Sequence, residues 1–175
     1  PATTGPGGIG PLGDRARRQA NDPLAQGNVN APVVMLIYED YACPFCIKFS
    51  LDQEPKLKAK YVDTGKLRFE WRDLPIFGAE SELAATAGRA AGNQGKFWEY
   101  KAALHQGAPA TGKPSFNREM LLEHARQMGI KDMARFERDM NDPNIKAKVM
   151  ADRQEAAQVG FTSTPSFVVH GRPVV

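Results

Sequence analysis

Two cysteines separated by two residues are the feature of this chain with the clearest chemical potential. They are the only cysteines among 175 residues and form the run Cys43-Pro44-Phe45-Cys46. Two intervening residues let the second thiol reach the first within one helical turn. The pair can then close a disulfide or resolve a mixed disulfide with another protein. The spacing therefore indicates reversible thiol–disulfide exchange, a chemistry that needs no cofactor beyond the two sulfur atoms.

The residues around the dithiol predict that it lies between a strand and a helix. Residues 33–38 (VVMLIY) are continuously apolar, which is typical of a strand covered on both faces. A helix is expected to follow, with Pro44 at its first position and Pro55 interrupting it. Unpaired N–H groups and the helix dipole lower the pKa of a thiol at a helix N-terminus. We therefore expect Cys43 to be the exposed attacking thiolate and Cys46 the buried resolving thiol.

Two other interpretations of the cysteine pair are open. The cysteines could be core residues without a function, or they could be half of a zinc site, since Cys-x-x-Cys recurs in zinc centres. The remaining zinc ligands would have to come from His105, His124 and His170, which show no paired spacing. We interpret His124 as a helix-surface or core histidine, His105 as a helix-end residue and His170 as a turn residue. The sequence therefore predicts no metal site.

A second segment with chemical potential is Thr164-Pro165, directly before a predicted strand. Most prolines in such a position follow a trans peptide bond. In a chain that also has the strand, dithiol and helix described above, we expect Pro165 to be cis and to face the cysteines. The backbone of Thr164 would then be available to pair with a substrate strand through main-chain hydrogen bonds.

Two carboxylates, Glu39 and Asp40, lie four and three residues before Cys43. A carboxylate next to the buried thiol can carry its proton, which is general acid–base chemistry. The alternative is that both are ordinary surface acids at the end of a strand. Of the two, Glu39 is the stronger candidate for a proton shuttle.

The remaining sequence predicts an α/β protein with a block of helices between its strands. Residues 67–71 alternate between apolar and charged types and predict a second strand. Residues 81–158 have the spacing of successive helices, and residues 166–169 and 173–175 predict a hairpin. One face of such a sheet would need a further helix after Val175, so either the chain is truncated there or another element covers that face; of the two, we expect truncation.

The composition suits one soluble globular domain, with 42% hydrophobic residues and a formal charge of +3. The basic residues are scattered among acidic ones, which argues against a nucleic-acid partner. No apolar run approaches the roughly 18–20 residues that span a membrane, and the first residues given lack the apolar stretch of a signal peptide. Residues 1–30 are rich in Gly, Pro, Ala and Asn and predict a flexible tail. This tail is either a tether or a terminus without a function.

Several short motifs, taken in order, resemble those of bacterial DsbA-like thiol–disulfide oxidoreductases of the thioredoxin superfamily. The resemblance covers the chain from about Asp22 to Val175. The motifs are NDPLAQG at 21–27, APV at 31–33, EDYACPFC at 39–46, EPKL at 54–57, YVDTGK at 61–66, RDLP at 72–75, QGKFW at 94–98 and GFTSTP at 160–165. A single motif of this kind is weak, whereas their shared order and spacing are specific.

The resemblance implies a thioredoxin fold with an inserted α-helical subdomain and with the final helix missing from this chain. The thioredoxin-like domain would comprise residues 31–75 and 160–175, and the inserted subdomain residues 76–159. The implied site is a redox-active Cys43–Cys46 pair with an active-site loop of Pro44, Phe45, Thr164 and Pro165. The implied work is oxidation of cysteines in newly exported proteins, outside the cytoplasm, with a redox partner that resets the dithiol. The protein would be secreted into a periplasm-like space or cell envelope, or tethered through a missing N-terminus.

Phe45 departs from the best-known members of this group, which carry Pro-His between the cysteines. That histidine helps to stabilise the thiolate, whereas phenylalanine offers neither a charge nor a hydrogen bond. We therefore expect a less acidic Cys43 and a less oxidising protein. Besides a dithiol oxidase, the alternatives are a reductase or isomerase of the same fold, or a non-catalytic extracytoplasmic holdase or metal-binding protein.

Overall fold

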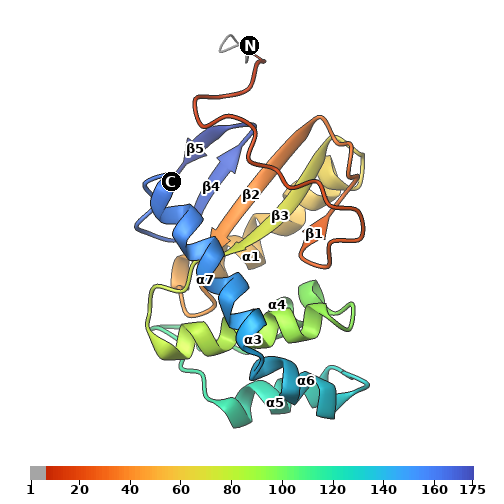
Figure 1. The fold of residues 1–175 in the computed structure, drawn as a ribbon, viewed down its shortest axis with the longest axis vertical. Helices are drawn as coiled ribbons and strands as arrows, with labels where there is room; N and C mark the ends of the chain where they lie inside the picture. The colour runs from red at the N-terminus through yellow and green to blue at the C-terminus, as the bar shows by residue number, and fades with distance from the viewer. Residues whose placement is uncertain (1–6) are drawn as a thin grey trace.

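The computed structural model describes residues 7–175 and shows a mixed sheet with a layer of helices beyond one end of it (Figure 1). In chain order the elements are β1 (Ala25–Gln26), β2 (Val33–Glu39), α1 (Pro44–Asp52), α2 (Glu54–Leu57), the π-helix η1 (Lys58–Val62), β3 (Leu67–Asp73), α3 (Ala79–Gly92), α4 (Phe97–Gln106), α5 (Arg118–Gln127), α6 (Met133–Met140), α7 (Pro143–Gln158), β4 (Ser166–Val169) and β5 (Arg172–Val174). This order confirms the predicted α/β class with helices between the strands.

The sheet has the strand order β1-β3-β2-β4-β5. The central strand β2 pairs in parallel with β3 and antiparallel with β4, so that Ile37 lies opposite both Trp71 and Phe167. Strand β2 is buried from Val34 to Glu39, which confirms the prediction of a strand covered on both faces. The short edge strand β1 pairs antiparallel with β3 and was not predicted. Because β2 and β3 are parallel, their carboxyl ends meet at the edge of the sheet that faces the helical layer.

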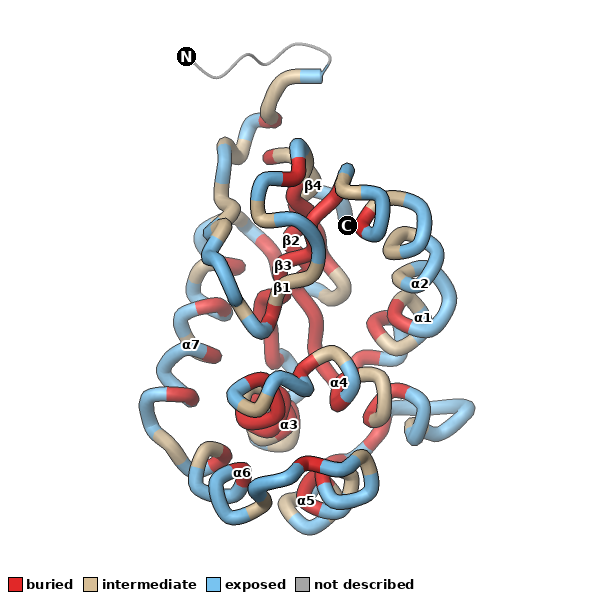
Figure 2. Tube along the Cα trace, turned by 90° about the vertical axis from the view of Figure 1, so that its right-hand side faces the viewer, coloured by how far each residue is buried: buried red, intermediate tan, exposed pale blue. Residues whose placement is uncertain are grey.

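Two hydrophobic cores lie on opposite faces of the sheet. On one face, Ile37 and Trp71 belong to a core that continues into the helical layer through Phe97 and Tyr100. The other face carries a smaller core of Val34, Leu36, Tyr38, Leu74, Ala156, Phe161 and Val168. Figure 2 shows α1 and α2 on one side of the sheet and α7 on the other, with α3 enclosed in the helical layer.

The helix that follows the dithiol is broken near the proline, as predicted. Helix α1 ends at Asp52, and Pro55 lies in the first turn of the short α2. A proline is tolerated in that turn because its missing N–H would have no helical partner there. The chain then turns through Gly65, whose φ of +81° lies in the left-handed region that favours glycine.

Helix α7 joins the helical layer to the sheet. Its residue Val149 belongs to the larger core, whereas Ala156, two turns later, packs against Leu36 and Tyr38 of β2. The carboxyl-terminal end of α7 therefore covers the sheet, although it lies within residues 76–159, the predicted inserted subdomain. The subdomain boundaries at residues 76 and 159 stay predictions, because α7 packs on both layers.

The prediction of a flexible tail over residues 1–30 was wrong for the residues that the structure describes, and residues 1–6 lie outside them. The N-terminal segment crosses one face of the sheet (Figure 1). The amides of Gly10 and Leu12 donate hydrogen bonds to the carbonyls of His170 (2.8 Å) and Gly171 (3.0 Å). Leu24 is 7% exposed and belongs to the larger core. The low apolar content of this segment predicts a flexible tail, but the segment is held mainly by polar partners on the sheet.

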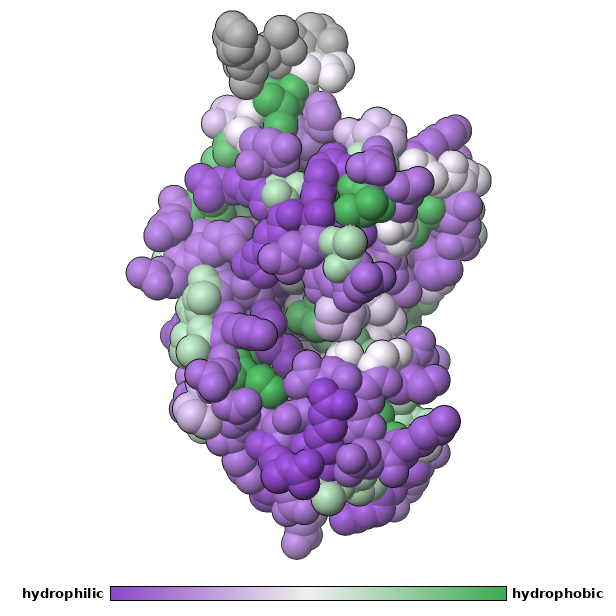
Figure 3. Space-filling view, turned by 45° about the vertical axis from the view of Figure 1, so that its right-hand side comes forward, coloured by the Kyte–Doolittle hydropathy of each residue, from purple (hydrophilic) through white to green (hydrophobic). Residues whose placement is uncertain are grey.

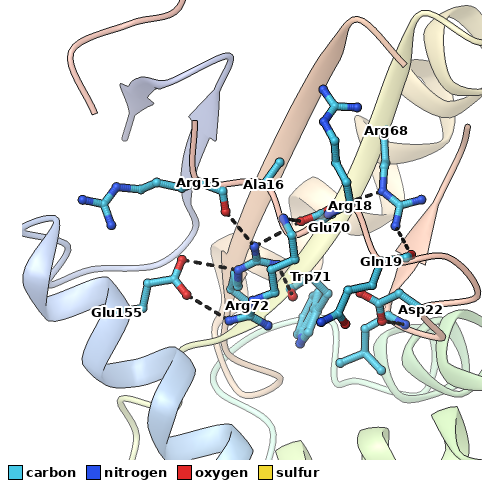
Figure 4. Close-up of polar contacts among 12 residues, drawn as sticks. Arg15, Ala16, Arg18, Gln19, Asp22, Arg68, Glu70, Trp71, Arg72 and Glu155 are labelled. Carbon is cyan, nitrogen blue, oxygen red and sulfur yellow. Dashed lines mark hydrogen bonds and ion pairs between the residues drawn. The ribbon is translucent and has the colours of Figure 1, made fainter. Parts of the chain in front are cut away.

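Those partners are charged side chains of β3 that lie beneath the segment (Figure 4). The carboxylate of Glu70 accepts the backbone N–H groups of Arg17 (2.9 Å) and Arg18 (3.0 Å). The side chains of Arg68 and Arg72 also donate to this carboxylate, at 3.0 and 3.1 Å. Burial raises the pKa of Glu70, but these hydrogen bonds outweigh it and the pKa is lowered. The polar side of β3 is thus an anchoring surface for the N-terminal segment and is not exposed to solvent.

The surface is largely polar in the view of Figure 3, with hydrophobic side chains in small separate groups. Among the described residues, the large hydrophobic side chains that remain exposed are Phe45, Leu51, Ile76, Phe77, Val174 and Val175. Within residues 7–175, no helix has both the length and the apolar character needed to cross a membrane.

Candidate active site

The dithiol lies where β2 ends and α1 begins, at the junction of the sheet and the helical layer. Cys43 is the N-cap of α1, and its Sγ accepts a hydrogen bond from the backbone N–H of Cys46 at 3.2 Å. The Cys43 thiol also donates to the carbonyl oxygen of Thr164 at 3.4 Å. The Thr164–Pro165 peptide bond is cis, as predicted, so the structure brings the two sequence-distant segments together.

Both cysteines lie below the surface as free thiols. Cys43 is 3% exposed and Cys46 is 0% exposed, so the prediction of an exposed Cys43 was wrong. The loop at Thr164 packs onto the Cys43 sulfur and accounts for its low exposure. The residue that projects from the active-site turn is Phe45, which is 73% exposed.

The two thiols differ widely in acidity. A hydrogen bond from the Cys46 thiol, assisted by the amides of Cys46 and Phe45, outweighs burial and lowers the pKa of Cys43 to about 6. Burial, the hydrogen bond to Cys43 and the charge of Glu39 raise the pKa of Cys46 far above its ordinary value. Cys43 therefore becomes acidic through hydrogen bonds, although Phe45 contributes no charge.

We expect iodoacetamide to alkylate the reduced, folded protein at Cys43 with a rate midpoint near pH 6. The unfolded chain in denaturant is the control, and its midpoint should be about 8.5, the ordinary value for a cysteine. Because folding lowers this pKa, the Cys43 thiolate contributes stability that grows as the pH rises from about 6 to about 8.5 and is lost as the pH falls through 6, while the raised pKa of Glu39, about 8, opposes this gain up to about pH 8. A midpoint above pH 8 in the folded protein would contradict the geometry.

Glu39 is the carboxylate that lies free beside the dithiol. It is 1% exposed, and neither of its carboxylate oxygens has a hydrogen-bond partner within residues 7–175. Burial raises the pKa of Glu39 to about 8; the Lys101 charge opposes this, while Glu54 and Cys43 reinforce it. A carboxyl group with this pKa changes its protonation state near neutral pH and can exchange a proton with a neighbouring thiol.

Asp40, by contrast, is occupied by structural hydrogen bonds. Its carboxylate accepts the N–H groups of Ala42 (2.7 Å), Ile76 (2.7 Å) and Phe77 (3.2 Å) and the hydroxyl of Ser81 (2.8 Å). These bonds hold the active-site turn against the connection between β3 and α3. Asp40 therefore positions the active-site turn. Of the two acids, Glu39 is the better placed for proton transfer.

A buried lysine below the dithiol was missed by the sequence reasoning. The Nζ atom of Lys101 lies 2.6 Å from an oxygen of Glu54 and 3.2 Å from the hydroxyl of Ser50, and Lys101 is 1% exposed. Its ammonium also lies 5.2 Å from the ring centroids of both Trp71 and Trp98. The signal that could have found it is its place one turn after Phe97 on the apolar side of the predicted helix.

The histidines considered as zinc ligands lie in different settings. His105 is buried in the last turn of α4, with its ring centroid 5.9 Å from that of Tyr41. His170 is in the turn between β4 and β5 at a φ of +50°. The part of the chain that the structure describes contains no group of three or more His, Cys, Asp or Glu side chains placed to hold a metal ion.

The thioredoxin family model matches residues 19–175, which include the dithiol, the Thr164–Pro165 loop and every strand of the sheet. The chain belongs to the thioredoxin family. The probable disulfide bond formation protein D of Bacillus cereus is 30% identical over 148 residues, which are 83% of this chain and 68% of that protein.

Solved structures agree with this assignment. BdbD from Bacillus subtilis, in its oxidised form, superposes with a TM-score of 0.79 at 22% identity, covering 88% of this chain and 84% of that one. The α-DsbA1 protein of Wolbachia pipientis gives a TM-score of 0.71 at 25% identity, covering 83% and 73%. This thioredoxin-family protein is therefore a DsbA-like thiol–disulfide oxidoreductase, and the predicted thioredoxin fold with helices added between its strands is confirmed.

Proposed function

We propose that the protein is a dithiol oxidase that transfers its Cys43–Cys46 disulfide to cysteine thiols of exported proteins. The observation that carries the proposal is the low pKa of Cys43, about 6, against the raised pKa of Cys46. A stabilised thiolate favours the reduced form of the enzyme, which makes its disulfide a strong oxidant. The hydrogen bonds at Cys43 supply this stabilisation although the turn between the cysteines lacks a histidine.

The exchange proceeds in two steps. A substrate thiolate attacks Sγ of Cys43, a mixed disulfide forms, and Cys46 leaves with the electron pair and takes up a proton. A second substrate thiolate then attacks the substrate sulfur of the mixed disulfide and releases Cys43 as a thiolate. The substrate has lost two electrons to the enzyme, and a redox partner that accepts them restores the Cys43–Cys46 disulfide.

The surface beside Cys43 supports an unfolded polypeptide as the substrate. A cleft of about 480 Å³ is lined by Phe45, Phe49, Thr164, Pro165 and Phe167. We propose that an extended cysteine-containing segment lies in this cleft and pairs with the backbone at Thr164. An apolar cleft suits the hydrophobic side chains that a partly folded exported protein still exposes.

We place this work outside the cytoplasm, in a periplasm-like space or the cell envelope. A chain whose only cysteines form the reactive pair suits an oxidising compartment, because it has no third thiol to be mispaired. Secretion and attachment through a preceding N-terminal segment are both consistent with the proposal.

The reduction potential of the Cys43–Cys46 pair tests the proposal. We expect a value less negative than about −200 mV after equilibration with glutathione, together with rapid oxidation of a reduced, unfolded protein when glutathione disulfide is the terminal oxidant. A potential near that of thioredoxin, about −270 mV, would instead establish a reductase and overturn the oxidase proposal.

Glu39→Gln is expected to slow the exchange by at least about tenfold near pH 7, because the buried Cys46 then loses its nearest proton acceptor and donor. Stopped-flow fluorescence over pH 5–9 would measure the rate, and the loss should be accompanied by an altered pH profile. Asp40→Asn is the matched variant: it weakens hydrogen bonds to backbone and is expected to lower stability while keeping the wild-type pH profile. An unchanged profile in Glu39→Gln would exclude the shuttle.

A further inference from the structure

A second cleft borders the active-site turn on the side of the helical layer. It has a volume of about 440 Å³ and lies between α1 and the connection from α4 to α5. Pro44, Ile47 and Leu51 line it from one side, and Pro109 from the other. Phe45 lines both this cleft and the one that contains Pro165, so its exposed ring stands between the two.

His105 is the buried polar residue of this second cleft. It is 1% exposed, and neither ring nitrogen has a hydrogen-bond partner among the residues that the structure describes. The neighbouring Tyr41 hydroxyl also lacks a partner in that part of the chain. Buried polar groups are nearly always paired, because an unpaired donor or acceptor costs free energy. A partner for this imidazole must therefore come from outside residues 7–175.

The charge state of His105 restricts what that partner can be. Burial and the charge of Lys101, one turn earlier in α4, lower the pKa of His105 well below its ordinary value. The ring is then neutral and offers one N–H donor and one acceptor nitrogen. An amide group matches this pair of functions, whereas a carboxylate or an ammonium group would lose its hydration without gaining an opposite charge.

We propose that His105 is a specificity residue that binds an amide group of the polypeptide substrate, on the side of Phe45 away from Pro165. The inference rests on the proposed function and extends it to the substrate segment beyond the reacting cysteine. The amide belongs either to the substrate main chain or to an asparagine or glutamine side chain near that cysteine. The ring nitrogens are covered in this structure, so the residues that cover them must shift to admit the amide.

The oxidation of a peptide by the His105→Phe variant tests this subsite. Phenylalanine fills the space of the imidazole ring and removes both hydrogen bonds to the substrate amide. We expect KM for a two-cysteine peptide to rise about five- to a hundredfold, the effect of two hydrogen bonds between uncharged groups. The rate with 2-mercaptoethanol, a thiol that carries no amide group, and the Cys43 alkylation midpoint should stay unchanged. His170→Asn, in the β4–β5 turn, is the control and should behave as the wild type.

Two peptides, with glutamine or alanine next to the cysteine, identify the source of the amide. If the glutamine side chain binds, the wild type prefers that peptide and His105→Phe loses the preference; if the main chain binds, KM rises equally for both. An unchanged KM overturns the subsite. So does an equal loss with 2-mercaptoethanol together with a shifted Cys43 midpoint, because His105 would then act through the fold of the dithiol.

A second measurement avoids any change at His105. In Cys46→Ala the Cys43 thiolate attacks a peptide whose cysteine is activated as a disulfide and displaces the other thiol, which leaves a mixed disulfide that no resolving cysteine releases. The ¹⁵N resonances of the His105 ring should move when the peptide is attached. Resonances that do not move overturn the proposal. Failure of the proposed function is distinct: the wild type would then fail to oxidise either peptide, whereas failure of the subsite leaves oxidation intact.

Discussion

Cys43→Ser should lower the rate of peptide oxidation by more than about a thousandfold, whereas reduced Cys46→Ser should form a mixed disulfide with an activated cysteinyl peptide and stop there. The attacking sulfur must be a thiolate, and of the two cysteines only Cys43 is acidic enough to be one near neutral pH. In Cys43→Ser the remaining thiol is buried and protonated. In Cys46→Ser the acidic Cys43 remains and can hold a substrate in a mixed disulfide that no resolving thiol releases.

Mass spectrometry of acid-quenched mixtures of each variant with an activated cysteinyl peptide measures this asymmetry. A stable adduct with Cys46→Ser and none with Cys43→Ser is the expected result. The same pair of variants separates the enzyme from a holdase, because a holdase would keep its full effect on an unfolded client after Cys43→Ser. Equal adduct formation by both variants would contradict the assigned order of the two cysteines.

The core of the site could be predicted because its chemistry is local in the chain. A buried strand, two cysteines and a proline-initiated helix occupy residues 33–52 without interruption, and their spacing already determines where Cys43 lies in the helix. The cis bond before Pro165 lies in a segment 121 residues away from Cys43 in sequence, and it was predicted from its company with the strand, dithiol and helix, in agreement with the family resemblance.

Lys101 was missed, and the burial of His105 near the dithiol was not predicted, because both depend on contacts between distant elements. Lys101 and His105 come from α4, and nothing in their local sequence shows that this helix packs against α1 below the dithiol. The exposure of Cys43 was predicted wrongly for the same reason, since the Thr164 loop that covers it belongs to another part of the chain.

The N-terminal segment shows a different limit of sequence reasoning. Its low hydrophobicity predicts disorder when apolar burial is the only stabilising term that is counted. Here backbone amides of Arg17 and Arg18 bind a carboxylate that two arginines of β3 hold in place. Complementary polar partners of this kind are invisible in composition, because the segment and its partners lie about fifty residues apart.

Asp152→Ala is expected to reduce the free energy of unfolding by about 3–5 kcal/mol, the usual cost of breaking a buried ion pair. Asp152 lies on α7 and is 1% exposed. Its carboxylate oxygens lie 2.6 Å from the guanidinium groups of both Arg17 and Arg89, and it accepts the backbone N–H of Asp73 at 3.0 Å. One side chain thus connects the N-terminal segment, α3, α7 and the end of β3. Removing it leaves the Arg89 guanidinium and the backbone N–H of Asp73 without this acceptor at a buried position.

Urea denaturation of the oxidised protein measures the loss, with Glu123→Ala as the control because that carboxylate belongs to an exposed pair with Arg126 worth about 0.5 kcal/mol or less. A loss below about 1 kcal/mol for Asp152→Ala would contradict a stabilising network. The alkylation midpoint of Cys43 in the same variant separates two effects. An unchanged midpoint means that the network joins the layers without setting the thiol pKa. A shifted midpoint means that it also positions the carboxyl ends of β2 and β3, where Glu39 lies opposite Asp73.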